Sequence, residues 1–420
     1  MIFLDPITRA PLIGSMLMTL SSALIGVFLL IRKRSLVGEA LSHAAYPGVV
    51  IAAFFFPQSD ALKTFCILGG ALFFTLIAMS FMDLLKRFRF HEDAVLTLTL
   101  STFLGVGILI ASRLQFTNPL AYVQIGQFLY GQVATMRDFH ILLYGTLSAV
   151  VVTFVVLFYH PLRLMHFNPS YAKILGMKHR ILERSLKLLT ALSIVIGIRT
   201  VGVVLMSGML IAPAIAGRSL SHKLSGILWI SASVGLLSGF LGNYFSTEIT
   251  SVHLPIGPMI LLCAASFALL ALFLSPERGL IVRWFRIFRF NKQRREENIL
   301  KTLWKNEGAC SLQAIQSYLP LPKIVLFLEL RALIYQGFIE KRALYQFTPD
   351  GRKKAARIVR LHRLWELYLF HQHRVCPEKV HTSADEMEHI ITPNVEKRLA
   401  DLLGNPEKDP HDKPIPRGEV

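Results

Sequence analysis

Long apolar stretches fill the first 275 residues of the chain, and short polar segments separate them. A bilayer core of about 30 Å is crossed by a helix of about 20 apolar residues, so each stretch of that order predicts a membrane span. We expect about nine such helices, at 11–31, 38–56, 64–85, 94–112, 139–159, 186–199, 202–217, 226–245 and 256–275. The pattern predicts an all-α polytopic membrane bundle over residues 1–279.

Two parts of this region depart from the simple pattern. Gly197, Arg199 and Gly202 divide the apolar run 186–217 into two short helices or into one discontinuous helix, so the count ranges from eight to ten. Residues 115–136 are too polar to span, and we expect them to lie at the outer interface or to re-enter the membrane.

Composition and charge support a membrane protein and suggest its orientation. Hydrophobic residues make up 53% of the 420 residues, and 45 Lys and Arg against 27 Asp and Glu give a net charge of +18. Basic residues cluster in alternate loops, which places the N-terminus outside and the C-terminal part in the cytoplasm. The cysteines have no CxxC spacing, so we expect free thiols in a reducing compartment: Cys66, Cys263, Cys310 and Cys376.

A basic segment separates the apolar part from a soluble one. Residues 280–295 (LIVRWFRIFRFNKQRR) interleave aromatic residues with arginines, which is typical of a helix at the lipid headgroups or of a basic linker. The pattern beyond it predicts helices at 296–317 and 323–336, a hairpin at 338–348 and a helix at 349–371. This order indicates a winged helix-turn-helix over 296–352, followed by a helical domain over 353–420.

Ionisable residues within the apolar region are the first candidate site. Glu39 and His43 are spaced i, i+4, which places a carboxylate and an imidazole on one helical face. His253 precedes the last predicted span and lies beside backbone that two prolines and a glycine keep irregular. Such groups are costly at bilayer depth, and their oxygen and nitrogen atoms suit Mn, Fe or Zn. The alternative is that Glu39 caps a helix start and His43 bonds a neighbouring helix.

Three separated motifs in this region resemble the permease subunits of bacterial ABC transporters for manganese, iron and zinc. They are RKRSLVGEALSHAAYPG at 32–48, GVVLMSGMLIAPAIAG at 202–217 and the H-x-P-x-G of 253–257. The resemblance implies a multi-pass protein of the bacterial inner membrane. It also implies that Glu39, usually Asp in the family, and His253 face a pathway for the metal between two permease copies, alike or paralogous. An extracytoplasmic metal-binding protein would deliver the ion.

The same resemblance implies a separate ATPase subunit. The chain has no G-x-x-x-x-G-K-[ST] loop, nor the H-E-x-x-H of a zinc protease or a nucleophile–base set, so we expect a transporter permease rather than an enzyme. The segment 167–176 resembles the coupling helix that contacts the ATPase, through Phe167, Pro169, Ala172 and Gly176. An ordinary amphipathic connector would have the same pattern. We interpret His91, Glu92 and Asp93, at the start of a span, as a helix cap with favourable dipole charge rather than as a metal site.

A second group of ionisable residues lies in the soluble part. His362 and Glu366 share one helical face, and a second face carries His381, Asp385, Glu388 and His389. With the segment 402–416, these residues resemble the diphtheria-toxin-repressor family of metal-dependent regulators, over about 297–416. The resemblance implies a metal-binding and dimerisation-like domain in which His362, Glu366 and His381 hold one or both ions, and Asp385, Glu388 and His389 the effector ion. Asp385, in place of a Cys, favours manganese.

Two features of the soluble part depart from that family. Its first helix has Asn298 where the family places a Met or Asp ligand, and Lys301 follows one turn on. The expected recognition helix, 322–331, is nearly all apolar, although base readout needs polar side chains. Two hypotheses stay open: a permease whose tail senses metal and restrains the ATPase cycle, and a bifunctional permease and DNA-binding repressor with a basic wing at 352–354.

Overall fold

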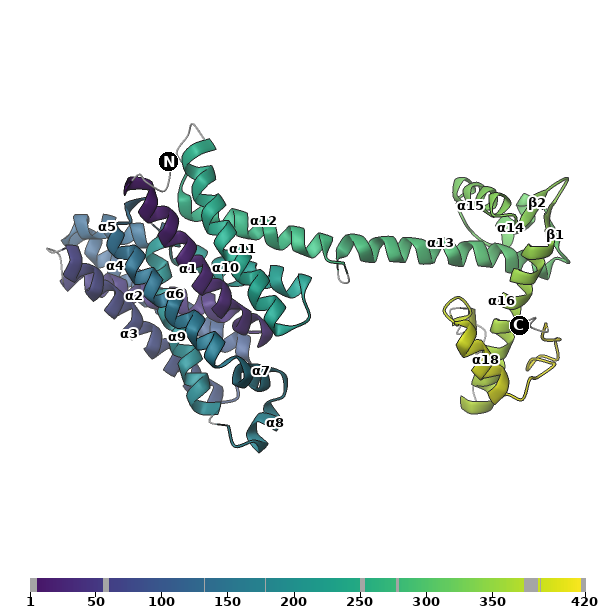
Figure 1. Cartoon of the computed structure of the whole chain (residues 1–420), viewed down its shortest axis with the longest axis horizontal. Helices are drawn as coiled ribbons and strands as arrows, with labels where there is room; N and C mark the ends of the chain where they lie inside the picture. The colour runs from purple at the N-terminus through teal and green to yellow at the C-terminus, as the bar shows by residue number, and fades with distance from the viewer. Residues whose placement is uncertain are drawn as a thin grey trace. The chain divides into compact units, whose positions relative to one another are not determined.

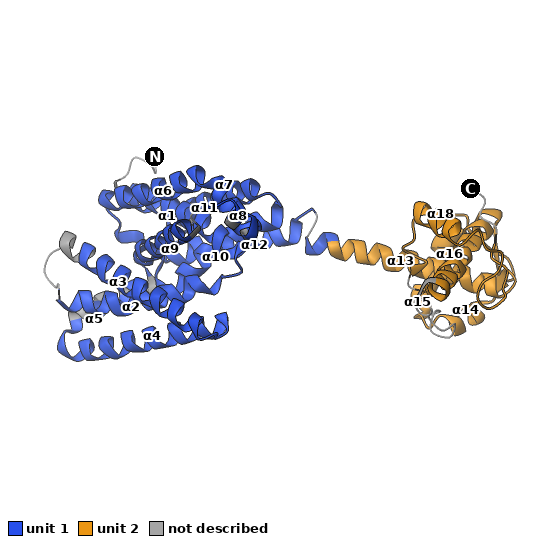
Figure 2. Ribbon diagram, turned by 90° about the horizontal axis from the view of Figure 1, so that it is seen from below, with its two compact units in different colours: residues 1–282 blue, residues 283–420 orange. Residues whose placement is uncertain are grey.

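The protein, described here from a computed structural model, consists of two compact units, residues 1–282 and residues 283–420 (Figure 2). The structure describes residues 6–55, 60–131, 133–177, 179–249, 254–276, 279–373, 384–385 and 387–416.

The first unit is a bundle of helices (Figure 1). Its helices are α1 (Pro6–Ile31), α2 (Leu36–Phe55), α3 (Asp60–Arg87), α4 (Glu92–Thr117), α5 (Pro119–Tyr130), α6 (Asp138–Leu157), α7 (Tyr159–Phe167), α8 (Pro169–Ile174), α9 (His179–Val201), α10 (Val203–Leu220), α11 (Leu224–Tyr244) and α12 (Ile256–Leu274), with short turns η1 (Val133–Thr135) and η2 (Phe245–Ile249). Within the described residues, eight are long and apolar enough to cross a membrane: α1, α2, α3, α4, α6, α10, α11 and α12.

Helix α9 is the ninth long helix of this bundle, and it begins with charged residues. Arg180, Glu183, Arg184 and Lys187 occupy its first half, whereas Ile194, Val195 and Ile198 in its second half are buried. The break expected within 186–217 occurs at Gly202 alone, whose φ of 94° favours glycine. Gly197 and Arg199 lie inside α9 and do not interrupt it. Residues 186–217 therefore belong to two separate helices.

Residues 115–136 are also helical for the most part. Helix α4 continues to Thr117, and α5 has 12 residues. A helix of that length is about 18 Å long, which is too short for a bilayer core. This length agrees with the expectation that the segment does not span.

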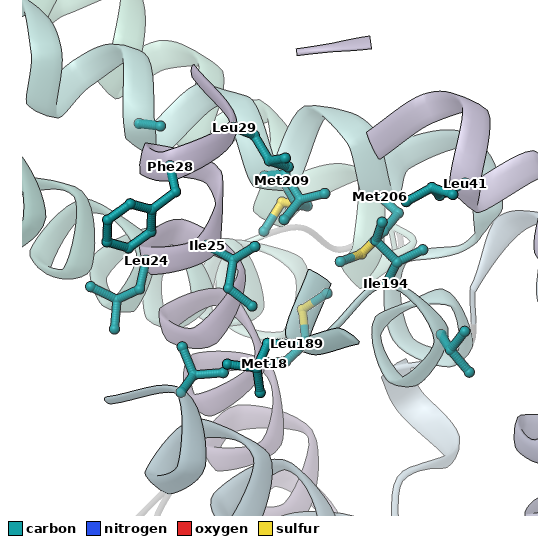
Figure 3. Packing of buried hydrophobic residues seen from close by; sticks show 14 of the residues in the cluster. Met18, Leu24, Ile25, Phe28, Leu29, Leu41, Leu189, Ile194, Met206 and Met209 are labelled. Carbon is teal, nitrogen blue, oxygen red and sulfur yellow. The ribbon is translucent and has the colours of Figure 1, made fainter. Parts of the chain in front are cut away.

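Small residues allow the central helices to approach closely. A Cβ on Gly26 of α1 would lie 1.7 Å from the Leu210 carbonyl oxygen of α10, and one on Gly48 of α2 would lie 2.1 Å from that of Gly70 in α3. Small residues at helix contacts are the usual means by which membrane helices pack. Around these contacts, Met and branched side chains from α1, α2, α9 and α10 form a buried core. Figure 3 shows Leu41, Met206 and Met209 within this core.

Two hydrogen bonds place the ends of three helices together. Arg218, near the end of α10, donates to the Leu30 carbonyl at the end of α1 (3.3 Å). The Ser275 hydroxyl, after α12, donates to the Ser219 carbonyl (2.6 Å). Because α2 begins five residues after α1 ends, the start of α2 lies at this same end of the bundle. The start of α12 lies at the opposite end.

The second unit begins with a long helix and contains a small sheet. Its elements are α13 (Leu280–Lys305), β1 (Ala309–Cys310), α14 (Leu312–Tyr318), α15 (Lys323–Tyr335), β2 (Ile339–Lys341), β3 (Tyr345–Phe347), α16 (Pro349–His373) and α18 (Pro393–Leu402). The strands form an antiparallel sheet in the order β1-β3-β2. Helices α13, α14, α15 and α16 enclose a core that includes Ile299, Leu303, Leu330 and Leu333.

Residues 280–295, expected to be a helix at the headgroups or a basic linker, form the first part of α13, and the division between the two units falls among them, after Val282. One boundary of the soluble part differs from the expectation. The helix expected at 296–317 instead stops at Lys305, because Glu307 and Gly308 adopt positive φ angles of 56° and 91°. A short strand and α14 follow. The two later helices and the hairpin form in the expected order.

Candidate functional site

Glu39 and His43 lie on one face of α2 in the first unit. Glu39 is in the first turn of the helix, His43 is one turn further, and both are half-buried. The same face continues with Tyr46 and Val50, which are buried against α4 and α5. Buried His43 Nδ1 has no hydrogen-bond partner within the described part of the chain. An unpaired ring nitrogen beside a carboxylate is a suitable ligand pair for a divalent ion.

His253 falls outside the described residues, so its side chain cannot be placed with those of Glu39 and His43. The chain resumes at Leu254, directly before α12. Since α12 starts at the end of the bundle opposite to the start of α2, residues 39 and 254 lie at opposite ends. A helix of 19 residues such as α12 is about 28 Å long. Glu39 and the described residue nearest to His253 are therefore at opposite ends of the bundle.

The segment 167–176 forms a short exposed helix. Asn168 Oδ1 accepts a hydrogen bond from the Tyr171 backbone (3.1 Å), α8 begins at Pro169, and Gly176 has a φ of 67°. These are the helix start and stop that the sequence predicts. Ala172 is buried, whereas Ile174 is 81% exposed. Exposed apolar side chains on a small helix are typical of a contact surface for another protein.

The start of α4 carries acids but no side-chain cap. His91 is in the N-cap position without a capping hydrogen bond, and Glu92 and Asp93 are in the first turn. Glu92 pairs with Arg34 (2.9 Å) and Lys86 (3.2 Å). The predicted capping hydrogen bond is therefore not formed, whereas the acidic first turn is present and Glu92 forms ion pairs there.

Most of the predicted ligands of the soluble part come together. His362 Nδ1 lies 2.6 Å from Glu388 Oε2, and His362 Nε2 lies 3.1 Å from Glu366 Oε1. His362, Asp385 and Glu388 each offer a ligand atom, and the three atoms are within 4.8 Å of one another. We call these three residues the acid–histidine cluster. His381 falls outside the described residues.

A lysine from α13 lies inside the acid–histidine cluster. Lys301 Nζ donates to Asp385 Oδ1 (2.6 Å) and to both Glu388 oxygens (2.8 and 3.0 Å), and it is 3.0 Å from His362 Nδ1. The Glu388 side chain is fully buried, and that of Lys301 is 12% exposed. The sequence had marked Lys301 as a departure from the family pattern, but it gave no indication of these contacts.

His389 forms a separate pair with Glu297 of α13. Its Nδ1 lies 2.5 Å from Glu297 Oε2, and Gln293 donates to the other Glu297 oxygen (2.8 Å). His389 Nε2 is buried and has no hydrogen-bond partner among the described residues. Glu297 was not among the predicted site residues. Its spacing of i, i+4 from Lys301 is the signal that would have placed both on one face of α13.

The charges of the acid–histidine cluster affect its histidine. Burial lowers the pKa of His362, but hydrogen bonds to Glu366 and Glu388 raise it more, so the pKa lies above its usual value despite Lys301 nearby. His362 therefore carries a proton more readily than a free histidine. A protonated ring nitrogen is not a metal ligand.

The expected recognition helix α15 presents apolar side chains to its surroundings within this unit. Ile324, Phe327 and Leu328 are exposed, whereas Leu326 and Leu330 are buried. Glu329 is also buried and pairs with Arg295 (2.7 Å). This surface lacks the row of amides and guanidinium groups that reads base edges.

Two family models match the chain. The model of the ABC 3 transport family matches residues 5–275. The model of the iron dependent repressor, metal binding and dimerisation domain matches residues 348–417. The two matches fall on the two parts that the sequence distinguishes.

Similar proteins are found in several bacteria. A probable metal transport system membrane protein of Chlamydia trachomatis is 33% identical, and the match covers 99% of this chain and 97% of the relative. The manganese transport system membrane protein MntC of Bacillus subtilis is 31% identical over 87% of this chain and 85% of its own length. The zinc transport system membrane protein TroC of Treponema pallidum is 30% identical over 68% of this chain and 94% of its own.

A solved structure shares the fold of the first unit. PsaBC from Streptococcus pneumoniae, determined in complex with Fab, matches 68% of this chain and 96% of its own chain with a TM-score of 0.58. Its sequence identity of 24% supports the fold alone.

Proposed function

The chain belongs to the ABC 3 transport family, and we propose that it is the permease subunit of an ATP-driven importer of divalent manganese, iron or zinc. The relatives named for manganese and zinc transport support this substrate class. The observation that carries the proposal is the face of α2, where Glu39 stands one turn from His43 and its unpaired Nδ1.

The proposed pathway has two stations. The ion passes His253 near the outer end of the bundle and then Glu39 and His43 near the inner end, because α12 starts and α2 starts at opposite ends. Both Glu39 and His43 are half-buried within one chain, which leaves surface for a second permease copy across the pathway. Two stations that each bind weakly allow an ion to enter and also to leave.

The partners follow from the exposed parts of the chain. An extracytoplasmic metal-binding protein delivers the ion at the outer end. A separate ATPase subunit contacts α8, whose exposed Ile174 and Tyr171 supply an apolar contact. In this arrangement the N-terminus is outside, the tail is cytoplasmic, and the protein resides in the bacterial inner membrane.

Metal uptake in cells tests the proposal. The chain, made with its ATPase subunit and binding protein in cells that lack their own manganese and zinc importers, should restore accumulation of one of the three metals. Glu39→Ala should abolish it. Asp83→Asn, which alters a carboxylate paired with Lys187, should leave it nearly unchanged. Restored uptake by Glu39→Ala, with equal protein in the membrane, would reject the α2 site.

The tail is proposed to restrain transport. Its repressor-like domain is joined to the last span by α13, which begins six residues after α12 ends. A chain stopped after Arg289 should accumulate more metal than the full chain at equal amounts of protein. Equal accumulation would contradict a restraining role.

The second candidate function is a DNA-binding repressor, favoured by the helices and hairpin of 312–347 and the basic residues Arg352, Lys353 and Lys354. The apolar surface of α15 argues against it. A gel-shift of the full chain in nanodiscs with the DNA upstream of its own gene decides: salt-sensitive, sequence-selective binding would establish the repressor.

A further inference from the structure

The acid–histidine cluster of the tail has the donor set of a divalent metal site but contains an ammonium. His362, Asp385 and Glu388 offer one nitrogen and carboxylate oxygens within 4.8 Å of one another. Lys301 Nζ is 2.6 to 3.0 Å from all three residues. These are ordinary lengths for charge-assisted hydrogen bonds.

The hydrogen-bonding capacity of the ammonium is used within this cluster. An ammonium has three N–H groups, and three carboxylate oxygens accept from it: Asp385 Oδ1 and both oxygens of Glu388. Its charge neutralises part of the negative charge of Glu388, whose side chain is fully buried. A buried carboxylate needs such a partner, because an unpaired buried charge is strongly destabilising. Lys301 thus does for these groups what a bound cation does in a metal site.

A divalent ion does not fit these residues while Lys301 is in place. Zinc, for example, requires carboxylate oxygens at about 2.0–2.2 Å, and those oxygens are already engaged by the ammonium. The ion would also add positive charge next to Lys301 Nζ. The family resemblance assigns His362 to one or both metal ions and Asp385 and Glu388 to the effector ion, and the presence of Lys301 among these three residues disagrees with a resident metal there.

We propose that Lys301 is a built-in substitute for the divalent cation: its ammonium occupies the cation position of the acid–histidine cluster, excludes the metal and joins α13 to α16, Asp385 and Glu388. The sequence gives this substitution a simple basis, since a carboxylate or thioether on α13 would add a ligand, whereas a lysine adds the charge itself. A tail built in this way keeps these contacts at any metal concentration. The inference concerns the tail alone and does not depend on the proposed transport.

Cobalt binding to the full chain in nanodiscs tests the inference, because Co²⁺ reports its ligands through its visible absorption. Wild type, Glu388→Gln, Lys301→Met and Lys301→Met/Glu388→Gln are titrated with Co²⁺. Lys305→Met, an exposed lysine one turn further along α13, is the matched control. The loss of Co²⁺ binding caused by Glu388→Gln, with and without Lys301→Met, separates binding at the cluster from binding in the membrane unit.

Lys301→Met should gain one Co²⁺ per chain, with an affinity about tenfold or more above that of wild type at this cluster. The gain should disappear in the double variant, and Lys305→Met should match wild type. Glu388-dependent binding in wild type as tight as in Lys301→Met would overturn the proposal, as would a folded Lys301→Met without the added ion. If Lys301→Met does not fold, Co²⁺ binding by wild type is compared with that by Asp385→Asn. The proposal requires equal binding, and weaker binding by Asp385→Asn would overturn it.

Discussion

Lys301 Nζ lies 2.8 Å from Glu388 Oε2, and this contact joins the first helix of the tail to a fully buried carboxylate 87 residues later. Because Glu388 has no exposed surface, solvent cannot replace the lysine. The ion pair is therefore a structural requirement of the tail rather than a surface contact.

Replacing Lys301 by alanine should destabilise the tail in the absence of metal. Removing one partner of a buried pair leaves the other unpaired, which costs about 3–5 kcal/mol. We expect faster amide hydrogen exchange in α13 and α16 of Lys301→Ala, with the membrane helices unaffected. Lys305→Ala, at an exposed position of the same helix, should change little. Equal exchange in both variants would show that the pair is dispensable.

An acidic residue on α8 should disrupt the contact with the ATPase subunit. Ile174 is 81% exposed, and Ile174→Asp introduces a charge into the proposed apolar interface. We expect the ATPase subunit to be lost from the purified complex, with at least about tenfold weaker association. Ile324→Asp alters an equally exposed isoleucine of the tail (76%) and should retain the subunit. Retention by both variants would place the interface elsewhere.

The first unit should become less stable as the pH is lowered, because His166 is neutral in the folded chain. Burial, together with Arg32, lowers the pKa of His166 to about 4. Its Nδ1 donates to the Leu162 carbonyl (2.7 Å), and its Nε2 accepts from Arg32 (3.1 Å), which in turn pairs with Glu183 of α9. Both ring nitrogens are thus used by the neutral form. Protonation would remove the acceptor that faces Arg32.

The sign follows from this pKa. The unfolded chain binds a proton near pH 6.5 that the folded chain binds only near 4, so the stabilisation is complete above 6.5 and is lost as the pH falls toward 4. Thermal unfolding in detergent should show a steeper decline over this range for wild type than for His166→Gln. Parallel curves would mean that the pKa of His166 is the same in the folded and the unfolded chain.

Close contact between α2 and α3 should make Gly48 sensitive to a single methyl group. A Cβ on Gly48 would lie 2.1 Å from the Gly70 carbonyl oxygen, whereas one on Gly69 would have no atom within 4 Å. Gly48→Ala should lower the thermal stability by about 1–3 kcal/mol or more and reduce uptake, since α2 carries Glu39. Gly69→Ala should be neutral. A neutral Gly48→Ala would show that the two helices separate easily.

The sequence predicts those features that depend on local pattern. Apolar length identifies the spans, and the i, i+4 spacing places Glu39 and His43 on one face of α2. The absence of Gly and Pro from 280–305 would have predicted α13 as one helix. The end of α13 at Lys305 is harder to predict from the sequence, because it depends on a positive φ at Glu307, and glutamate rarely adopts such an angle.

The place of Lys301 could not be predicted from its own helix. Its three partners are His362 of α16, Asp385 and Glu388, and only their tertiary approach brings the ammonium among them. From the sequence, a lysine on the first helix indicates a missing ligand. In the structure, the long side chain of Lys301 reaches the cation position and supplies the positive charge there.

Movement of manganese across a membrane tests the central claim most directly. Proteoliposomes would contain the full chain with its ATPase subunit, with ATP on the side of that subunit and radioactive Mn²⁺ with the metal-binding protein on the other. We expect ATP-dependent transfer toward the ATP side, abolished by Glu39→Ala and competed by unlabelled Zn²⁺ or Fe²⁺. Transfer that proceeds without ATP, or that Glu39→Ala leaves unchanged, would contradict an ATP-driven pathway through α2.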